Sequence, residues 1–110
     1  MEVIPNRGDI WWVALDPTLG SENRKTRPCV VISVNVLNER RRTVLIVPLS
    51  SSPKASPPIL IPISCNGQPA VAVSDQIRAV AKERLRSRLG AVKPDEMAAL
   101  EDGLRQIMQL

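Results

Sequence analysis

Short apolar runs, each ended by turn-forming residues, constrain the fold of this chain more than any other feature of its sequence. The runs are Ile10–Leu15, Cys29–Ile32, Thr43–Leu49, Ile59–Ile63, Ala70–Val73 and Ile77–Val80. They are four to seven residues long and mostly rich in Val and Ile, which predicts strands rather than helices. Five or more short strands separated by turns predict a mainly β (α+β) fold built as a small barrel-like sheet.

A long polar segment, residues 16–28, lies between the first two runs. Both runs are continuously apolar, as expected of strands buried on two faces. Pro17 and Gly20 interrupt regular structure between them, and long loops in compact domains are usually functional or disordered. Because Pro28 biases the preceding residue towards an extended backbone, we expect the Arg27 guanidinium to be held at the mouth of the second strand.

Other local signals refine the predicted sheet. Pro62 cannot donate a ladder hydrogen bond, so its run is predicted to be an edge strand or to contain a bulge. Asn66-Gly67 indicates a tight hairpin between that run and the next one. Further along, Arg84, Arg86 and Arg88 alternate with other residues, so a strand there would carry a basic face.

The C-terminal segment has a different period. Pro94 suits the first position of a helix, and Asp95 and Glu96 follow where negative charge favours a helix N-terminus. Apolar residues then recur at helical spacing up to Met108, which predicts an amphipathic helix packed on the sheet or on a second subunit. Gly103 lowers the intrinsic stability of that helix by roughly 1 kcal/mol relative to Ala, so tertiary contacts must hold it.

The sequence contains no histidine, which removes several mechanisms. Neither a Ser-His-Asp triad nor a pair of imidazoles acting as acid and base is available. Cys29, in an apolar run, and Cys65, before a turn, do not make a zinc ligand set or a disulfide framework. We therefore expect no metal, no cofactor, and free thiols in a reducing cytoplasm.

Length and charge further narrow the class of protein to which the chain can belong. The 110 residues are expected to form one domain, 1–110. No apolar run approaches a membrane span, which favours a cytoplasmic protein that does not bind membranes. The net charge of +4 is compatible with a polyanionic partner. The remaining arginines, carboxylates and hydroxyls suit phosphate chemistry, because the planar Arg fork matches phosphate oxygens.

Two motifs connect the chain with a known family. Residues 8–22, GDIWWVALDPTLGSE, followed by KTRP at 25–28, resemble the N-terminal signature of the MazF/PemK/Kid toxins of bacterial toxin–antitoxin modules. The similarity extends over nearly the whole chain. It implies a homodimer of small SH3-like/CcdB-like barrels, each with a C-terminal helix, that cleaves single-stranded RNA without metal. It also implies an acidic antitoxin protein as partner.

Two other functions stay open for such a barrel. CcdB-like toxins share it but bind gyrase and catalyse nothing, and a catalytically inactive RNA-binding module is a third possibility. The Arg-Pro pair after the polar loop and the hydroxyl after the third strand resemble the nuclease branch. The preferred interpretation is therefore a sequence-selective endoribonuclease that cleaves mRNA.

The resemblance also implies a catalytic pair. In this family an Arg before Pro acts with a Thr or Ser after the third strand, which corresponds here to Arg27 and Ser50. Arg27 would stabilise the phosphorane and Ser50 would orient the scissile phosphate, with Ser51 as the alternative hydroxyl. The alternative role for Arg27 is a surface salt bridge with Glu22 or Asp16.

The general base is open between two carboxylates. Some family members use the acid of the GSE motif, here Glu22, and the Kid-like branch uses an Asp before Gln, here Asp75. That branch also has a His and an Arg where this chain has Ser21 and Val73, which favours the arrangement of Arg27, Ser50 and Glu22. The residues expected to bind substrate are Ser21, Lys25, Thr26, Ser51, Lys54, Asp75, Gln76 and Arg78.

Overall fold

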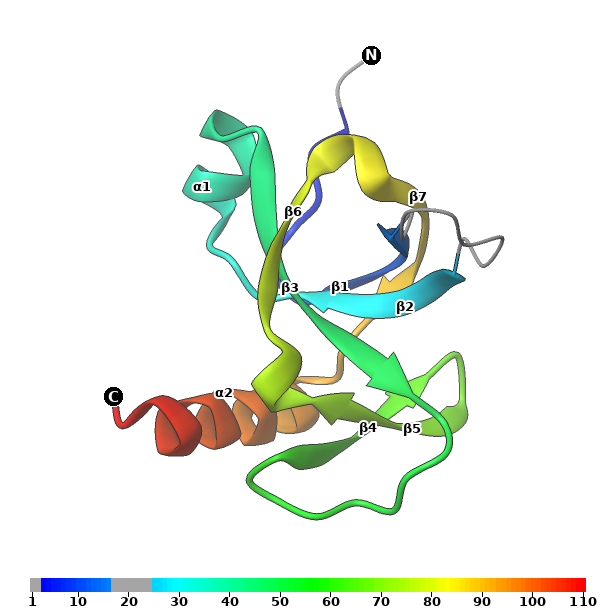
Figure 1. The fold of residues 1–110 in the computed structure, drawn as a ribbon, viewed down its shortest axis with the longest axis vertical. Helices are drawn as coiled ribbons and strands as arrows, with labels where there is room; N and C mark the ends of the chain where they lie inside the picture. Colours follow the sequence, from blue (N-terminus) through cyan, green and yellow to red (C-terminus); the bar gives the residue numbers. More distant parts are fainter. Residues whose placement is uncertain (1–2, 17–24) are drawn as a thin grey trace.

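The computed structural model describes residues 3–16 and 25–110 and confirms a mainly β fold with a C-terminal helix (Figure 1). The strands are β1 (Asp9–Asp16), β2 (Lys25–Val31), β3 (Thr43–Ser50), β4 (Leu60–Cys65), β5 (Gln68–Val73), β6 (Arg78–Ala81) and β7 (Leu85–Ala91). The helices are α1 (Asn35–Arg40) and α2 (Pro94–Met108), and the 3-10 turns are η1 (Ser74–Gln76) and η2 (Lys82–Arg84).

Antiparallel pairing orders the strands β4-β5-β3-β2-β1-β7, and β6 pairs with β3 outside this path. The two end strands of this path, β4 and β7, do not pair with each other, so the sheet curls without closing completely into a barrel. β4 ends the path, which confirms the edge position predicted from Pro62. Asn66 and Gly67 both have positive φ and join β4 to β5 in the predicted hairpin.

The sheet buries apolar side chains on both of its faces, in two separate clusters. Val30 and Cys29, neighbours on β2, belong to different clusters and both are completely buried, as predicted for that run. β1 contributes Ile10 to one cluster and Val13 to the other. The prediction of burial on two faces is wrong at Trp12, which is 37% exposed because it lies at a pocket instead of inside a cluster.

β3 changes partners along its length. On one edge it pairs with β2 as far as Pro48. On the other edge Thr43–Ile46 pair with β6, whereas Leu49 and Ser50 pair with β5. The turn η1 makes the bend between β5 and β6. Beyond Pro48 no pairing joins β3 to β2, so the two strands separate there.

The basic face predicted for the last strand is shorter than expected. β7 begins one residue later, so Arg84 lies in η2 and donates a hydrogen bond to the Ala14 carbonyl at 3.1 Å. Arg86 and Arg88 are exposed on β7. Arg88 also forms an ion pair with the buried Asp9, with Nε 3.1 Å from Oδ1.

The helix α2 starts at Pro94, as predicted, and packs against β4 and η1. Leu100 is completely buried in that contact. Glu96, in the first turn, accepts hydrogen bonds from the backbone N and the hydroxyl of Ser64 at 3.0–3.1 Å, which ties the helix to β4. Within the described part of the chain, neither helix is long and apolar enough to cross a membrane.

Gly103 has a packing role that helical spacing alone does not reveal. A Cβ at this position would lie 2.8 Å from the Pro58 carbonyl oxygen and 2.9 Å from Cδ1 of Ile61. Both distances are well below van der Waals contact, and one of the two atoms belongs to the backbone. The glycine therefore allows α2 to approach β4 and the segment before it closely.

Replacing Gly103 by Ala should destabilise the protein by about 1–3 kcal/mol, because overpacking outweighs the roughly 1 kcal/mol by which Ala favours a helix. Denaturant unfolding of Gly103→Ala beside the exposed control Arg105→Ala measures this effect. If Gly103→Ala were as stable as the unmodified protein, the contact with Pro58 would not hold α2 in place.

Candidate active site

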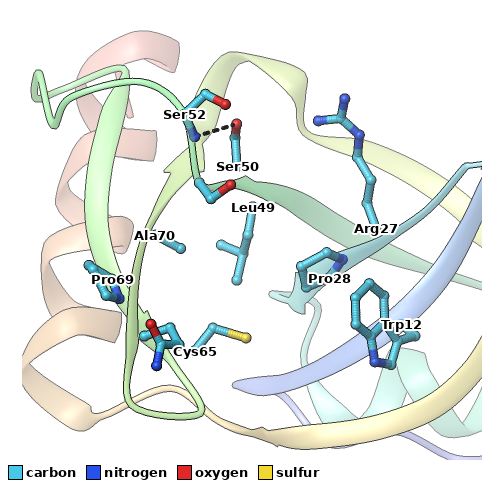
Figure 2. Close-up of a pocket in the computed structure, with 11 residues that line it drawn as sticks. Trp12, Arg27, Pro28, Leu49, Ser50, Ser52, Cys65, Pro69 and Ala70 are labelled. Atoms are coloured by element: carbon cyan, nitrogen blue, oxygen red, sulfur yellow. Dashed lines mark hydrogen bonds between the residues drawn. The ribbon is translucent and has the colours of Figure 1, made fainter.

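A pocket of about 410 Å³ lies where β3 parts from β2. Its lining comes from β1 and β2, from the end of β3 and the following loop, and from the β4–β5 hairpin (Figure 2). Among the residues predicted to act on substrate, Arg27, Ser50 and Ser51 line this pocket together. Two segments 23 positions apart in the sequence, at residues 27 and 50, therefore meet there.

Arg27 is the third residue of β2, so it lies inside the strand instead of at its mouth. It pairs with Val13 of β1, and its carbonyl accepts a hydrogen bond from the Cys29 thiol at 3.5 Å. The backbone of Arg27 is thus fixed while its side chain stays half-buried at the pocket. Among the described residues no hydrogen bond or ion pair involves its guanidinium.

Ser50 is the last residue of β3 and pairs with Val71 of β5. Its hydroxyl accepts a long hydrogen bond, 3.5 Å, from the backbone N of Ser52. Arg27 and Ser50 each lie two residues beyond the Cys29–Pro48 pair, which is the last pair of the β2–β3 ladder. Ser51 also lines the pocket but follows the strand and is exposed, so the ladder fixes Ser50 more firmly.

Two of the residues predicted in the polar segment, Ser21 and Glu22, lie outside the described residues. The alternative ion pair of Arg27 with Glu22 or Asp16 therefore stays a prediction. Lys25 and Thr26 begin β2, and Thr26 is exposed without lining the pocket.

The remaining predicted substrate-binding residues do not line the pocket. Lys54 is exposed in the loop between β3 and β4. Asp75 and Gln76 are exposed in η1, and Arg78 is exposed at the start of β6. The choice between Glu22 and Asp75 as general base stays a prediction.

Sequence reasoning missed most of the pocket wall. The lining residues that it did not single out are Trp12, Pro28, Leu49, Ser52, Cys65, Gln68, Pro69 and Ala70. No local signal marked Trp12, because the run Ile10–Leu15 is uniformly apolar. The hairpin residues carried no such signal, since only the change of partner by β3 brings β5 beside Leu49 and Ser50.

The buried sulfur of Cys29 lies close to two arginines. Burial raises the pKa of the Cys29 thiol to about 12, and the positive charges of Arg27 and Arg78 partly oppose this. Burial also raises the pKa of Cys65 in the pocket wall. Both thiols are therefore neutral at physiological pH, so neither is a ready nucleophile.

Comparison with known proteins gives one consistent result. Residues 6–108 match the family described as PemK-like, MazF-like toxin of type II toxin–antitoxin system. The chain is 33% identical over 99 residues to the endoribonuclease toxin MazF of Escherichia coli K12, covering 89% of this chain and 88% of that one. It is 34% identical over 113 residues to the endoribonuclease MazF9 of Mycobacterium tuberculosis, covering 94% and 96%.

Solved structures share the fold. MazF from Deinococcus radiodurans superposes with a TM-score of 0.82 at 22% identity, over 99% of this chain and 100% of that chain. An endoribonuclease in complex with its cognate antitoxin, from a mycobacterial species, has a TM-score of 0.82 at 21% identity, with 96% of each chain covered. At these identities the similarity concerns the arrangement of strands and helices.

The raised pKa of Cys29 predicts a loss of stability at alkaline pH. Above pH 9.0 the thiol ionises in the unfolded chain but not in the folded one, so the free energy of unfolding should fall as pH rises from 9 to about 12. Unfolding measured at pH 8 and pH 10.5 should show a smaller fall for Cys29→Ala than for the unmodified protein. Cys65→Ala should show a fall between the two, because burial raises the pKa of this less buried thiol as well, and an equal fall in all three proteins would contradict the burial of Cys29.

Proposed function

The chain belongs to the PemK-like, MazF-like toxins of type II toxin–antitoxin systems, and we propose that it cleaves single-stranded RNA at the pocket beside Arg27. It is an endoribonuclease toxin with an antitoxin as partner. The CcdB-like alternative is not favoured, since the relatives are named endoribonucleases. The observation that carries the proposed site is the position of Arg27 and Ser50 in one pocket.

The proposed chemistry uses the substrate's own 2′-hydroxyl as nucleophile. A carboxylate, Glu22 or Asp75, accepts its proton, and the oxygen attacks the adjacent phosphorus. The resulting dianionic phosphorane carries two negative charges, which a bidentate guanidinium stabilises through parallel hydrogen bonds. The bond from phosphorus to the 5′-oxygen then breaks, that oxygen takes up a proton from water, and the carboxylic acid returns its proton to the solvent.

Each half of the pocket supplies one part of this chemistry. Arg27, held in β2, would bind the non-bridging oxygens where negative charge develops. Ser50, held in β3, would donate a hydrogen bond that orients the phosphate before attack. Because both backbones are fixed by strand pairing, the two groups need little reorganisation when substrate binds.

The wider functional setting rests on family membership. We propose that the protein acts as a homodimer in the cytoplasm, selects particular RNA sequences and slows translation and growth by cutting mRNA. An acidic antitoxin would complement its net charge of +4.

Arg27→Ala should lower the cleavage rate by about a hundredfold to a thousandfold, because one preorganised donor to a developing anion is lost. Arg27→Lys should also be slow, since a point charge replaces a planar fork. The control is Arg105→Ala, an exposed substitution on α2 outside the pocket lining. Near-normal cleavage by Arg27→Ala would place the active site elsewhere.

Two matched substitutions test the choice of hydroxyl. Ser50→Ala should lower the rate by about tenfold or more, as expected when a hydrogen bond to a charged group is lost. Ser51→Ala removes the same atom one residue further along and should have a smaller effect. The reverse order of the two rates would assign the hydroxyl to Ser51.

The ends left on the RNA test the reaction itself. Attack by the 2′-oxygen must produce a 2′,3′-cyclic phosphate upstream and a 5′-hydroxyl downstream, and deoxyribose at the cut site should stop cleavage without preventing binding. Activity should survive excess EDTA, because the chain has no histidine and the described side chains form no cluster of three metal ligands. Mass spectrometry showing 3′-hydroxyl and 5′-phosphate ends would instead indicate hydrolysis by water.

A further inference from the structure

The chain has two aromatic side chains, and they have different environments. The indole Nε1 of Trp11 donates a hydrogen bond to Asp9 at 3.3 Å, and the ring packs against the cluster around Val13. Trp12 lies in neither apolar cluster, is 37% exposed and lines the pocket. Trp11 thus has a structural environment, whereas the ring of Trp12 presents apolar surface to the pocket.

The wall of the pocket opposite Trp12 contains no aromatic ring. Figure 2 shows Trp12 on one side, Pro69 and Cys65 on the other, and Leu49 between them. Gln68 also lines the pocket and starts β5, where it pairs with Cys65 beside the hairpin turn. The pocket therefore combines an aromatic wall, an apolar back and one side-chain amide.

This combination has the chemistry of a nucleobase site. A base stacks on an aromatic face whatever its identity, and its edge then forms hydrogen bonds with polar groups. The Gln68 amide offers a donor and an acceptor side by side, the arrangement that reads a base edge. The volume of about 410 Å³ lies in the range of small-molecule sites and leaves room for one base.

The position of the pocket beside Arg27 indicates that this base lies next to the phosphate bound there. A base is joined to its phosphate through one ribose, so a phosphate bound at Arg27 brings a neighbouring base within reach of the same pocket. Trp12 and Arg27 come from adjacent strands, where Trp12 pairs with Pro28 and Val13 pairs with Arg27. The β1–β2 ladder therefore holds the backbones of Trp12 and Arg27 in a constant relation.

We propose that this pocket binds the base of a nucleotide flanking the cleaved bond, with Trp12 stacking on the base and Gln68 reading its edge. The inference rests on the proposed endoribonuclease function and adds a specificity site to it. Stacking on Trp12 supplies affinity for any base, and Gln68 supplies the preference. The alternative occupant of the pocket is an apolar side chain of the antitoxin, and the test below distinguishes it from a base.

The test is a double-mutant cycle on RNA affinity, in which Trp12→Leu in the protein is combined with removal of one base from the RNA. The cleavage site of the unmodified protein is mapped first, and the RNA is then made uncleavable by one 2′-deoxyribose. Removing the base at one flanking position should weaken binding about five- to hundredfold, and Trp12→Leu should weaken binding of the complete RNA similarly. With Trp12→Leu, removing that base should weaken binding by a clearly smaller factor, because only the contact with Gln68 is then left to lose, and Trp12→Phe should restore most of the affinity.

Gln68 is tested at the same position of the RNA. Gln68→Leu should reduce the discrimination among the four bases there while leaving the penalty for the missing base in place. Ile59→Ala is the control, because Ile59 is 46% exposed but does not line the pocket. In that variant both the discrimination and the penalty should equal those of the unmodified protein.

A second readout is independent of Trp12 substitution. In a Trp11→Phe protein, Trp12 is the sole source of indole fluorescence, which the complete RNA should quench and the RNA lacking the flanking base should not. The base site would be overturned if the effects of Trp12→Leu and of base removal on RNA binding were additive at every position of the RNA, or if both RNAs quenched the fluorescence equally. If Trp12→Leu then weakened binding of the antitoxin, the pocket would be assigned to that partner. If the unmodified protein cleaved no RNA, the proposed function would fail first.

Discussion

The need of β3 to satisfy its backbone hydrogen bonds on both edges governs the rest of the structure. Unpaired backbone groups in a protein interior cost free energy, so a central strand requires a neighbour along its whole length. β3 meets this requirement on one edge with β6 and then β5, whereas on the other edge it pairs with β2 only as far as Pro48. The change from β6 to β5 turns the end of the strand away from β2, and the pocket lies in the resulting gap.

Local patterns in the sequence predicted the elements well, because each depends on only a few neighbouring residues. Pro62 indicated an edge strand, Asn66-Gly67 indicated a hairpin, and Pro94 marked the start of α2, and all three predictions are confirmed. The curling of the sheet was less predictable. It depends on η1, whose three residues give no strong turn signal in Ser74-Asp75-Gln76.

The candidate site was predictable in part. Arg27 and Ser50 came from resemblance to a family, and the structure places them in one pocket, whereas their roles stay proposals. Trp12 was hidden by its context, since the run Ile10–Leu15 looks uniformly suited to burial and only the tertiary structure leaves one ring exposed. Gly103 was judged as a weakness of α2, but the close approach of Pro58 shows why the position excludes a side chain.

The pocket draws its lining from positions as far apart as residue 12 and residue 70. Such distant segments pair late, because the chain entropy of closing long loops has to be overcome before their contacts stabilise the fold. During synthesis on a ribosome, a chain that has emerged only as far as Ser50 already contains Arg27 and the serine but still lacks the hairpin that forms the opposite wall. The proposed active site is therefore incomplete until the chain has been synthesised at least as far as Ala70, the last residue of the pocket lining.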